Sequence, residues 1–190
     1  MDTTLPKLNN LTPITGRMVN EEDEIHNVVD AYGSLKTIGI EHTAVHDGKS
    51  FIYTGVAQIN SLATVYFLGR AGNVTAHLFD FFIKSDQAPM TISFFEAPTV
   101  TNAGSAQTAI NRNRQSTRTA TLAVFAGATV SADGTLLMTD KILGVQKDVT
   151  SDHLAGEWLL KKSIDYVFKI TNNSNQAANI AVGFNWVEVD

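Results

Sequence analysis

Two segments near the end of the chain carry apolar residues at every second position, with polar residues at several of the positions between them. In "IDYVFKI" the even positions are apolar and Asp165 and Lys169 stand between them; after the polar loop "NNSNQ", the segment "NIAVGFNW" repeats the pattern. The apolar positions are Ile164, Tyr166, Phe168 and Ile170, then Ile180, Val182, Phe184 and Trp186. A period of two is typical of a strand with one buried face, so these segments predict antiparallel strands that cover a core on one side.

The sequence between Leu35 and these segments also has the features of β-strands separated by turns. Short β-branched and aromatic runs such as "SFIYTGVAQI", "ATVYFLG", "VTAHLFDFFIK" and "MTISFFEAP" are separated by turn residues, including Asp47-Gly48, Gly72-Asn73 and Asp133-Gly134. The runs "KTIGIEHTAVH", "STRTATLAVFAG" and "VSADGTLLMTD" complete a set of about eight or nine expected strands. No helical pattern lies between them, which argues against parallel βαβ units. We therefore expect an all-β fold, an antiparallel two-sheet β-sandwich of jelly-roll-like type, with its strand order left open.

The N-terminal part of the chain has a different character. Residues 1–19 show no periodicity and contain two prolines and a glycine, so an extended arm is expected. Asn20 followed by "EEDE" is typical of a helix N-terminus, and Ile25, Val28, Val29 and Tyr32 share one helical face before Gly33. The predicted organisation is an arm at 1–19, a short helix at 20–34 and the β-sandwich at 35–190.

Bulk composition narrows the classes of function. The chain has 190 residues, enough for one domain with a core, and a formal net charge of −5, which argues against a general nucleic-acid binder. It has no cysteine, so disulfides, thiolate metal sites and a cysteine nucleophile are excluded. The start, "MDTTLPKLNN", lacks the features of a secretory signal, and no apolar run is long enough to span a membrane.

One short stretch stands out against this acidic background. "INRNRQSTRT", residues 110–119, contains Arg112, Arg114 and Arg118, three of the five arginines in the chain. Guanidinium groups can bind phosphate, carboxylate or sugar, or can simply be solvated on a strand.

Other chemistry-bearing residues form no convincing catalytic or metal pattern. His42 and His46 fall on one side of an expected strand, about 13 Å apart, which is too far for one metal ion. Asp80 and Glu96 lie among aromatic residues, an environment that can raise a carboxyl pKa, although pairing with an arginine is the commoner outcome. Trp158 and Trp186 are in register with core-facing positions, so we expect them in the core. Catalytic residues, metals and cofactors are not expected.

A set of short motifs occurs in a fixed order over roughly residues 42–188: Glu96, Asn111 to Arg114, Asp133-Gly134, Glu157-Trp158-Leu160, Tyr166, Ile170-Thr171-Asn172, Trp186 and Glu188. With these motifs the chain resembles a family of tailed-phage virion proteins, the small β-sandwich proteins of capsid decoration or cement type. "KKSID" departs from the expected turn before Tyr166, and the arm and helix lie outside the match. In this family pattern the last two strands form a hairpin.

The resemblance implies a non-enzymatic protein that binds the outer surface of the phage head and stabilises joints between major capsid subunits. It implies the major capsid protein and further copies of the chain, as a trimer, as partners, without direct nucleic-acid or membrane contact. It also implies a place on the virion exterior after synthesis in the host cytoplasm. The arginine stretch then becomes an interface element, with Arg112, Arg114, Arg118 and Glu96 as interface residues, in which Arg112 and Arg114 pair with carboxylates such as that of Glu96 or of an acidic neighbour. A tail or neck component, a carbohydrate- or receptor-binding module and a β-sandwich glycosidase or lyase remain the alternatives.

Overall fold

The computed structural model describes residues 19–20, 23–24, 26–29, 35–38, 40–86, 88–143, 150–153 and 157–189. The chain divides into two compact units, Met1–Ala44 and Val45–Asp190. Because their relative placement is not determined, each unit is described by itself.

The N-terminal unit contains short paired strands. β1 (Val19–Asn20) pairs with β2 (Asp23–Glu24), and β3 (His26–Val29) pairs with β4 (Leu35–Ile38), both antiparallel. The helix predicted over residues 20–34 is therefore wrong for the described part of that range. The β-branched pair Val28 and Val29 has a high strand propensity, and pairing with β4 outweighs the helical spacing of the apolar positions. Apart from Val19, the arm predicted at residues 1–19 lies outside the described residues.

The one short helix that the structure describes, α1 (Ile40–His46), lies where a strand was expected. Glu41 is in its first turn, where the helix dipole favours a negative charge. Gly48 ends the helix: it has a φ of 68°, and its N–H donates to the carbonyl oxygen of Val45 at 3.1 Å. Asp47-Gly48 is thus a helix terminus and not the hairpin turn that the sequence suggests.

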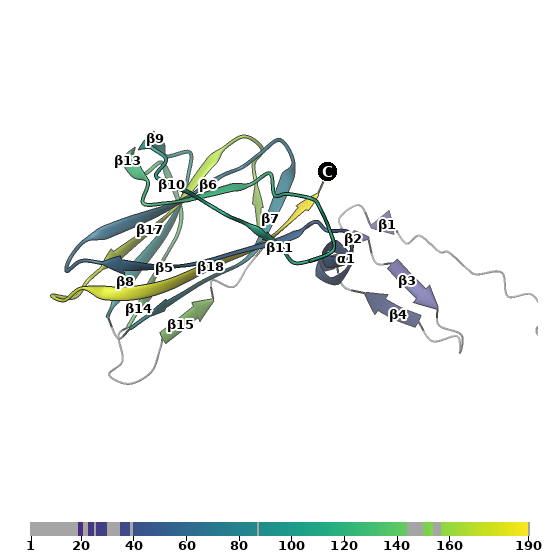
Figure 1. Ribbon diagram of the computed structural model, residues 1–190, viewed down its shortest axis with the longest axis horizontal. Coiled ribbons are helices and arrows are strands. Elements are labelled where there is room, and N and C mark those ends of the chain that lie inside the picture. Colours follow the sequence, from purple (N-terminus) through teal and green to yellow (C-terminus); the bar gives the residue numbers. More distant parts are fainter. Residues whose placement is uncertain are drawn as a thin grey trace, which may run out of the picture. The chain divides into compact units, whose positions relative to one another are not determined.

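The second unit is a β-sandwich of two antiparallel sheets, as predicted (Figure 1). The first sheet has the order β10-β12-β6-β17-β8-β14, and the second has the order β11-β5-β18-β7-β15, with β16 also paired to β7. The strands of the first sheet are β10 (Ser105–Gln107), β12 (Ala123–Ala126), β6 (Thr64–Arg70), β17 (Asp165–Asn172), β8 (Met90–Glu96) and β14 (Thr135–Ile142). Those of the second sheet are β11 (Ile110–Asn111), β5 (Ser50–Ile59), β18 (Ala178–Val189), β7 (Thr75–Ser85), β15 (Thr150–His153) and β16 (Trp158–Leu160).

Aromatic side chains join the two sheets. The ring of Phe168 in β17 lies 4.3 Å from that of Phe94 in the same sheet, measured between ring centroids. Across the sandwich it lies 3.9 Å from Phe81 in β7 and 5.0 Å from Phe184 in β18. Burial of these rings is the main source of stability for such a core.

The last two long strands show the predicted alternation but not the expected hairpin. Tyr166, Phe168 and Ile170 are buried in the first sheet, whereas Ile180, Val182, Phe184 and Trp186 are buried in the second. The connection between them therefore crosses from one sheet to the other. The buried side chain of Asn172 stabilises it by donating to the carbonyl oxygens of Ile59, Asn60 and Gln176.

A further pair of strands covers part of the outer face of the first sheet. β9 (Thr99–Asn102) pairs with β13 (Thr129–Ala132), and Figure 1 shows the two together at one end of the sandwich. Beneath them Leu68, Ala128 and Val167 form a second buried cluster. Val167 is consequently 0% exposed although strict alternation would direct it to solvent.

Candidate interface site at the arginine loop

The arginine loop, residues 110–119, begins with β11 and is held by the side chains of two asparagines. Asn111 is buried; its Nδ2 donates to the carbonyl oxygens of Gly48 at 2.8 Å and Arg118 at 3.0 Å, and its Oδ1 accepts the backbone N–H of Asn113. Asn113 donates to the carbonyl oxygen of His46 at 2.9 Å and accepts the backbone N–H of Gln115. Such side-chain bonds to backbone fix the part of the loop that follows β11 and is not paired in a sheet.

A buried carboxylate fixes the chain just beyond the loop. Glu188 in β18 is 0% exposed and accepts backbone N–H groups from Thr121 at 2.8 Å and Leu122 at 2.9 Å, together with Nε1 of Trp186 at 3.2 Å. Hydrogen bonds from three N–H donors compensate for removing this polar side chain from water. The loop is thus anchored at both ends, by Asn111 and by Glu188.

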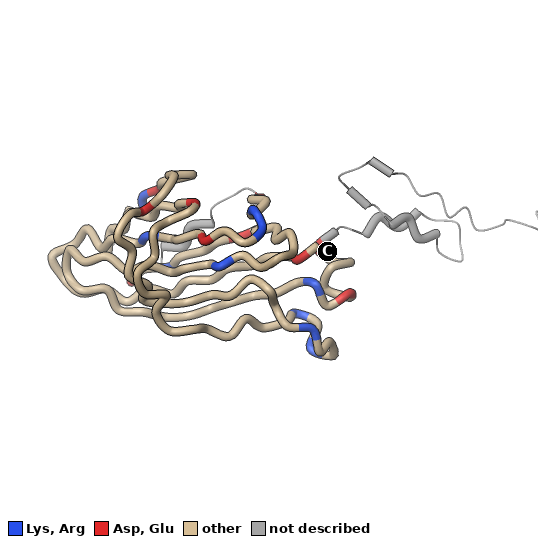
Figure 2. The backbone as a smooth tube through the Cα atoms, turned by 90° about the horizontal axis from the view of Figure 1, so that it is seen from above, with Lys and Arg blue, Asp and Glu red and all other residues tan. Residues whose placement is uncertain are grey.

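Two guanidinium groups project from this fixed backbone. Arg112 and Arg114 are exposed, whereas Arg118 is half-buried. Arg112 donates to Ser50 Oγ and Asn185 Oδ1, each at 3.5 Å, and Arg114 donates to the carbonyl oxygen of Asn111 at 3.5 Å. All three acceptors are neutral and the distances are at the long limit for a hydrogen bond. Figure 2 shows basic segments gathered at one end of the described chain, with an acidic segment beside them.

Glu96 does not join the arginine loop. Its carboxylate accepts from Lys161 Nζ at 2.6 Å and from the hydroxyl of Tyr166 at 3.1 Å, so the expected pairing of Glu96 with Arg112 or Arg114 is not what the described residues show. The bond from Lys161, aided by that from Tyr166, lowers the pKa of Glu96, and the pKa is not raised as its aromatic surroundings suggested. Burial, with the bond to Glu96, raises the pKa of Tyr166 to about 12.

The other candidate residues have identifiable structural settings. Asp80 lines a core cavity of about 10 Å³ together with Phe81, Trp158 and other residues. Trp186 is fully buried, as expected, and Trp158 packs against the same core while partly exposed. A second cavity, of about 20 Å³, is lined almost entirely by apolar residues of both sheets. Both volumes are close to that of a single water molecule.

The histidines give no metal cluster. His42 and His46 lie in α1, so the strand separation expected for them does not apply. His77 pairs with Glu157. Among the residues that the structure describes, no group of three or more His, Cys, Asp or Glu side chains could hold a metal ion.

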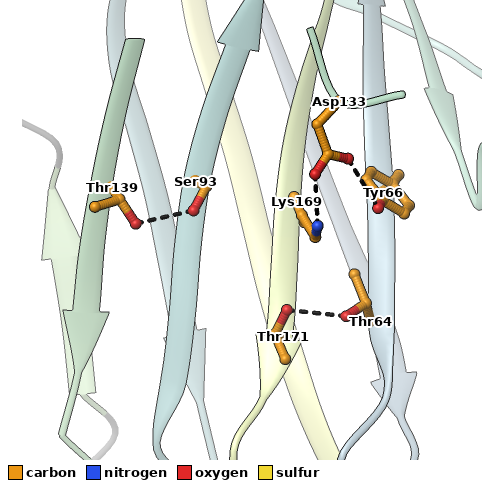
Figure 3. A network of polar contacts seen from close by, with 7 residues as sticks. All are labelled: Thr64, Tyr66, Ser93, Asp133, Thr139, Lys169 and Thr171. Carbon is orange, nitrogen blue, oxygen red and sulfur yellow. Dashed lines mark hydrogen bonds and ion pairs between the residues drawn. The ribbon is translucent and has the colours of Figure 1, made fainter. Parts of the chain in front are cut away.

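The outer face of the first sheet carries a group of polar residues whose proximity the sequence analysis did not predict. Asp133, at the β13–β14 turn, reaches Lys169 Nζ at 2.6 Å and the hydroxyl of Tyr66 at 3.0 Å (Figure 3). Burial and the bond to Asp133 raise the pKa of Tyr66, and the same carboxylate raises that of Lys169. The antiparallel pairing of β14, β8, β17 and β6 aligns the polar residues of this face in two rows. The rows are Thr139–Ser93–Lys169–Tyr66 and Lys141–Thr91–Thr171–Thr64. The polar residues at odd-numbered positions of β17 indicate that one side of this strand faces solvent. The polar residues beside them belong to β6, β8 and β14, which are distant in the sequence, so the group as a whole was not predictable.

Comparisons with known proteins identify no family. No protein-family model matches the chain, and no curated protein matches it. Among solved structures, the crystal structure of the Yersinia pseudotuberculosis-derived mitogen is similar over 73% of this chain and 86% of that chain, with 14% identity and a TM-score of 0.34. A likeness of this extent supports no inference about function. Within the described ranges, no helix is long and apolar enough to cross a membrane.

Proposed function

We propose that the chain is a structural protein of a tailed-phage virion, a decoration or cement protein that binds the outer surface of the head and stabilises joints between major capsid subunits without catalysis. The partners are the major capsid protein and further copies of the chain in a closed oligomer, a trimer. The residues involved act by contact, since adding buried area across a joint opposes its opening.

One observation carries the proposal: the motif residues that give the sequence resemblance fix the shape of the sandwich. Glu96 bonds Lys161 and Tyr166, and Glu188 bonds Trp186 and the chain that follows the arginine loop. Three further motif residues, Asn111, Gly134 and Asn172, hold a loop, a turn and a sheet crossing. Arg112 and Arg114 are charged motif residues that are exposed on a fixed backbone, which suits a contact surface.

The attachment of the protein to heads tests this proposal. Heads prepared without the protein are mixed with the full chain and with a variant that lacks residues 1–19, and bound protein is measured by sedimentation and electron microscopy. We expect the full chain to bind and to raise the temperature at which the heads open. The shortened chain should stay folded but lose binding, because the arm supplies the grip in this proposal.

Light scattering supplies the control on assembly state. A closed oligomer, expected to be a trimer, is consistent with the proposal, whereas a monomer that leaves head stability unchanged contradicts it. A second candidate, a glycan- or receptor-binding module, is favoured by the two polar rows on the first sheet, of which Figure 3 shows a part. Binding to purified host surface glycans, without binding to heads, would support this second candidate.

A further inference from the structure

Arg112 and Arg114 differ from the basic side chains of the sandwich whose ion pairs are described. Arg70 forms a two-bond fork with Asp165 at 2.8 and 2.9 Å, and Lys161 and Lys169 each lie 2.6 Å from a carboxylate oxygen. Within the described chain, Arg112 and Arg114 bond only neutral oxygens, at 3.5 Å. The two bonds from Arg70 to Asp165 are charge-assisted and therefore strong, whereas Arg112 and Arg114 make no bond of this kind within the described chain.

The loop backbone is already in a fixed conformation before any partner binds. The bonds of Asn111 and Asn113 define its turn, and the backbone N–H of Arg112 donates to the carbonyl oxygen of Ser50 at 2.9 Å. A fixed backbone loses little conformational entropy on binding. The interactions of Arg112 and Arg114 can therefore contribute most of their free energy to the affinity. The weak contacts of the guanidinium groups can be exchanged at little cost.

The chemistry of the ligand follows from charge. Guanidinium forks match both carboxylates and phosphates. A nucleic acid also requires an extended positive field, whereas this chain has a net charge of −5, and an acidic segment lies near the basic ones in Figure 2. A small number of carboxylates on a protein surface requires no such field, because short-range bonds suffice.

On the basis of the virion role proposed above, we propose that Arg112 and Arg114 form a carboxylate-binding site that docks an acidic segment of the capsid shell subunit. Each guanidinium exchanges its long bonds to neutral oxygens for a two-bond fork to an Asp or Glu side chain, of the kind that Arg70 makes with Asp165. The site supplies register and selectivity at the joint, in addition to contact area.

Binding measurements on the full chain test the site directly. The probes are a fluorescein-labelled hexaglutamate peptide and a labelled 20-base-pair DNA, followed by fluorescence anisotropy at low and physiological salt. The variants are Arg112→Ala/Arg114→Ala and Arg112→Lys/Arg114→Lys. The control is Lys84→Ala/Lys162→Ala, which removes the same charge from exposed positions elsewhere.

We expect the wild type and the control to bind hexaglutamate more tightly than DNA. The alanine pair should bind the peptide at least about tenfold more weakly, and the lysine pair should be intermediate because it keeps the charge but loses the fork. DNA binding equal to or tighter than peptide binding, equal loss in the control, or full binding by the alanine pair would each overturn the proposal. Unfolding midpoints near the wild-type value show that the variants are folded.

A parallel experiment with heads separates this site from the function on which it depends. If the alanine pair decorates heads as well as the wild type does, the site is refuted while the cement function stands. If the wild type binds hexaglutamate through these arginines but never binds heads, the carboxylate-binding chemistry stands, and both the capsid subunit as its partner and the cement function are refuted. Loss of head binding in the alanine pair alone supports both.

Discussion

At the scale of single residues, Glu96 and Glu188 show two ways of keeping a carboxylate in a β-sandwich. Glu96 is partly exposed and bonded to an ammonium and a phenol, whereas Glu188 is fully buried and bonded to N–H groups of backbone and indole. In the first case charge pairing stabilises the ionised form, and in the second hydrogen bonds replace water. Neither residue combines with a second acid or a histidine in the described structure.

The lowered pKa of Glu96 makes part of the stability depend on pH. Because Lys161 lowers this pKa below its ordinary value of 4.5, folding favours the ionised carboxylate; the stabilisation is present above pH 4.5 and is lost as pH falls through the lowered pKa. Urea unfolding of wild type and Glu96→Gln should therefore differ at pH 7 and converge in acid. In Lys161→Met, the NMR-detected pKa of Glu96 should rise. A stability difference that does not change with pH would contradict this account.

At the scale of elements, two glycines with positive φ differ in whether there is space for a side chain. Gly127 has a φ of 73° and a Cβ added there meets no atom within 4 Å, whereas Gly134 has a φ of 88° and the added Cβ would lie 2.3 Å from the carbonyl oxygen of Glu96. The turn at Gly134 therefore needs glycine for two reasons, conformation and space.

Alanine substitutions should show this difference. Gly127→Ala should reduce the free energy of unfolding by about 1–2 kcal/mol, the cost of a left-handed conformation. Gly134→Ala should cost at least about 1 kcal/mol more, because the clash displaces β8 or the turn that carries Asp133. Chemical denaturation of the two variants measures both values. Equal losses would mean that the turn at Gly134 relaxes freely.

Local sequence signals predicted some elements well and others poorly. Alternation located Tyr166, Phe168 and Ile170 in the core, because the period of two directly reflects one buried face. Alternation failed at Val167, where the distant β9–β13 pair covers the outer face, and helical spacing failed at His26–Val29, where β4 supplies strand partners. Contacts between distant segments cannot be predicted from local patterns in a single sequence.

The residues of the candidate site could be predicted from the sequence, but the contacts of the acidic residues considered with them could not. Clustering in the sequence was enough to single out Arg112 and Arg114, and the structure shows them exposed. The partner of Glu96 was not predictable, since Lys161 and Tyr166 reach it from 65 and 70 positions away. Likewise the link between Glu188 and the backbone beyond the arginine loop joins positions 67 apart.

At the scale of the whole molecule, the sandwich depends on a few rings that contact both sheets. Phe168 lies against Phe94 in its own sheet and against Phe81 and Phe184 in the other. A side chain with contacts on both sides couples the two sheets into one folding unit.

Truncation of this ring should therefore affect both sheets together. Phe168→Ala should reduce the free energy of unfolding by about 3–5 kcal/mol. Phe79→Ala, which removes a half-buried ring that stacks on His77 outside the buried clusters, should cost less. Far-UV and near-UV circular dichroism during denaturation should give coincident transitions in both variants. Separate transitions for Phe168→Ala would show that the sheets unfold independently.

The position of β18 between β5 and β7 has a consequence for how the protein is made. β5 and β7 are both neighbours of β18, and they precede it by roughly a hundred residues of synthesis. While the ribosome is still translating the intervening chain, the second sheet lacks its middle strand, and Glu188 has not emerged to secure Thr121 and Leu122. The chain just beyond the arginine loop therefore reaches its final conformation only after β18 has been translated.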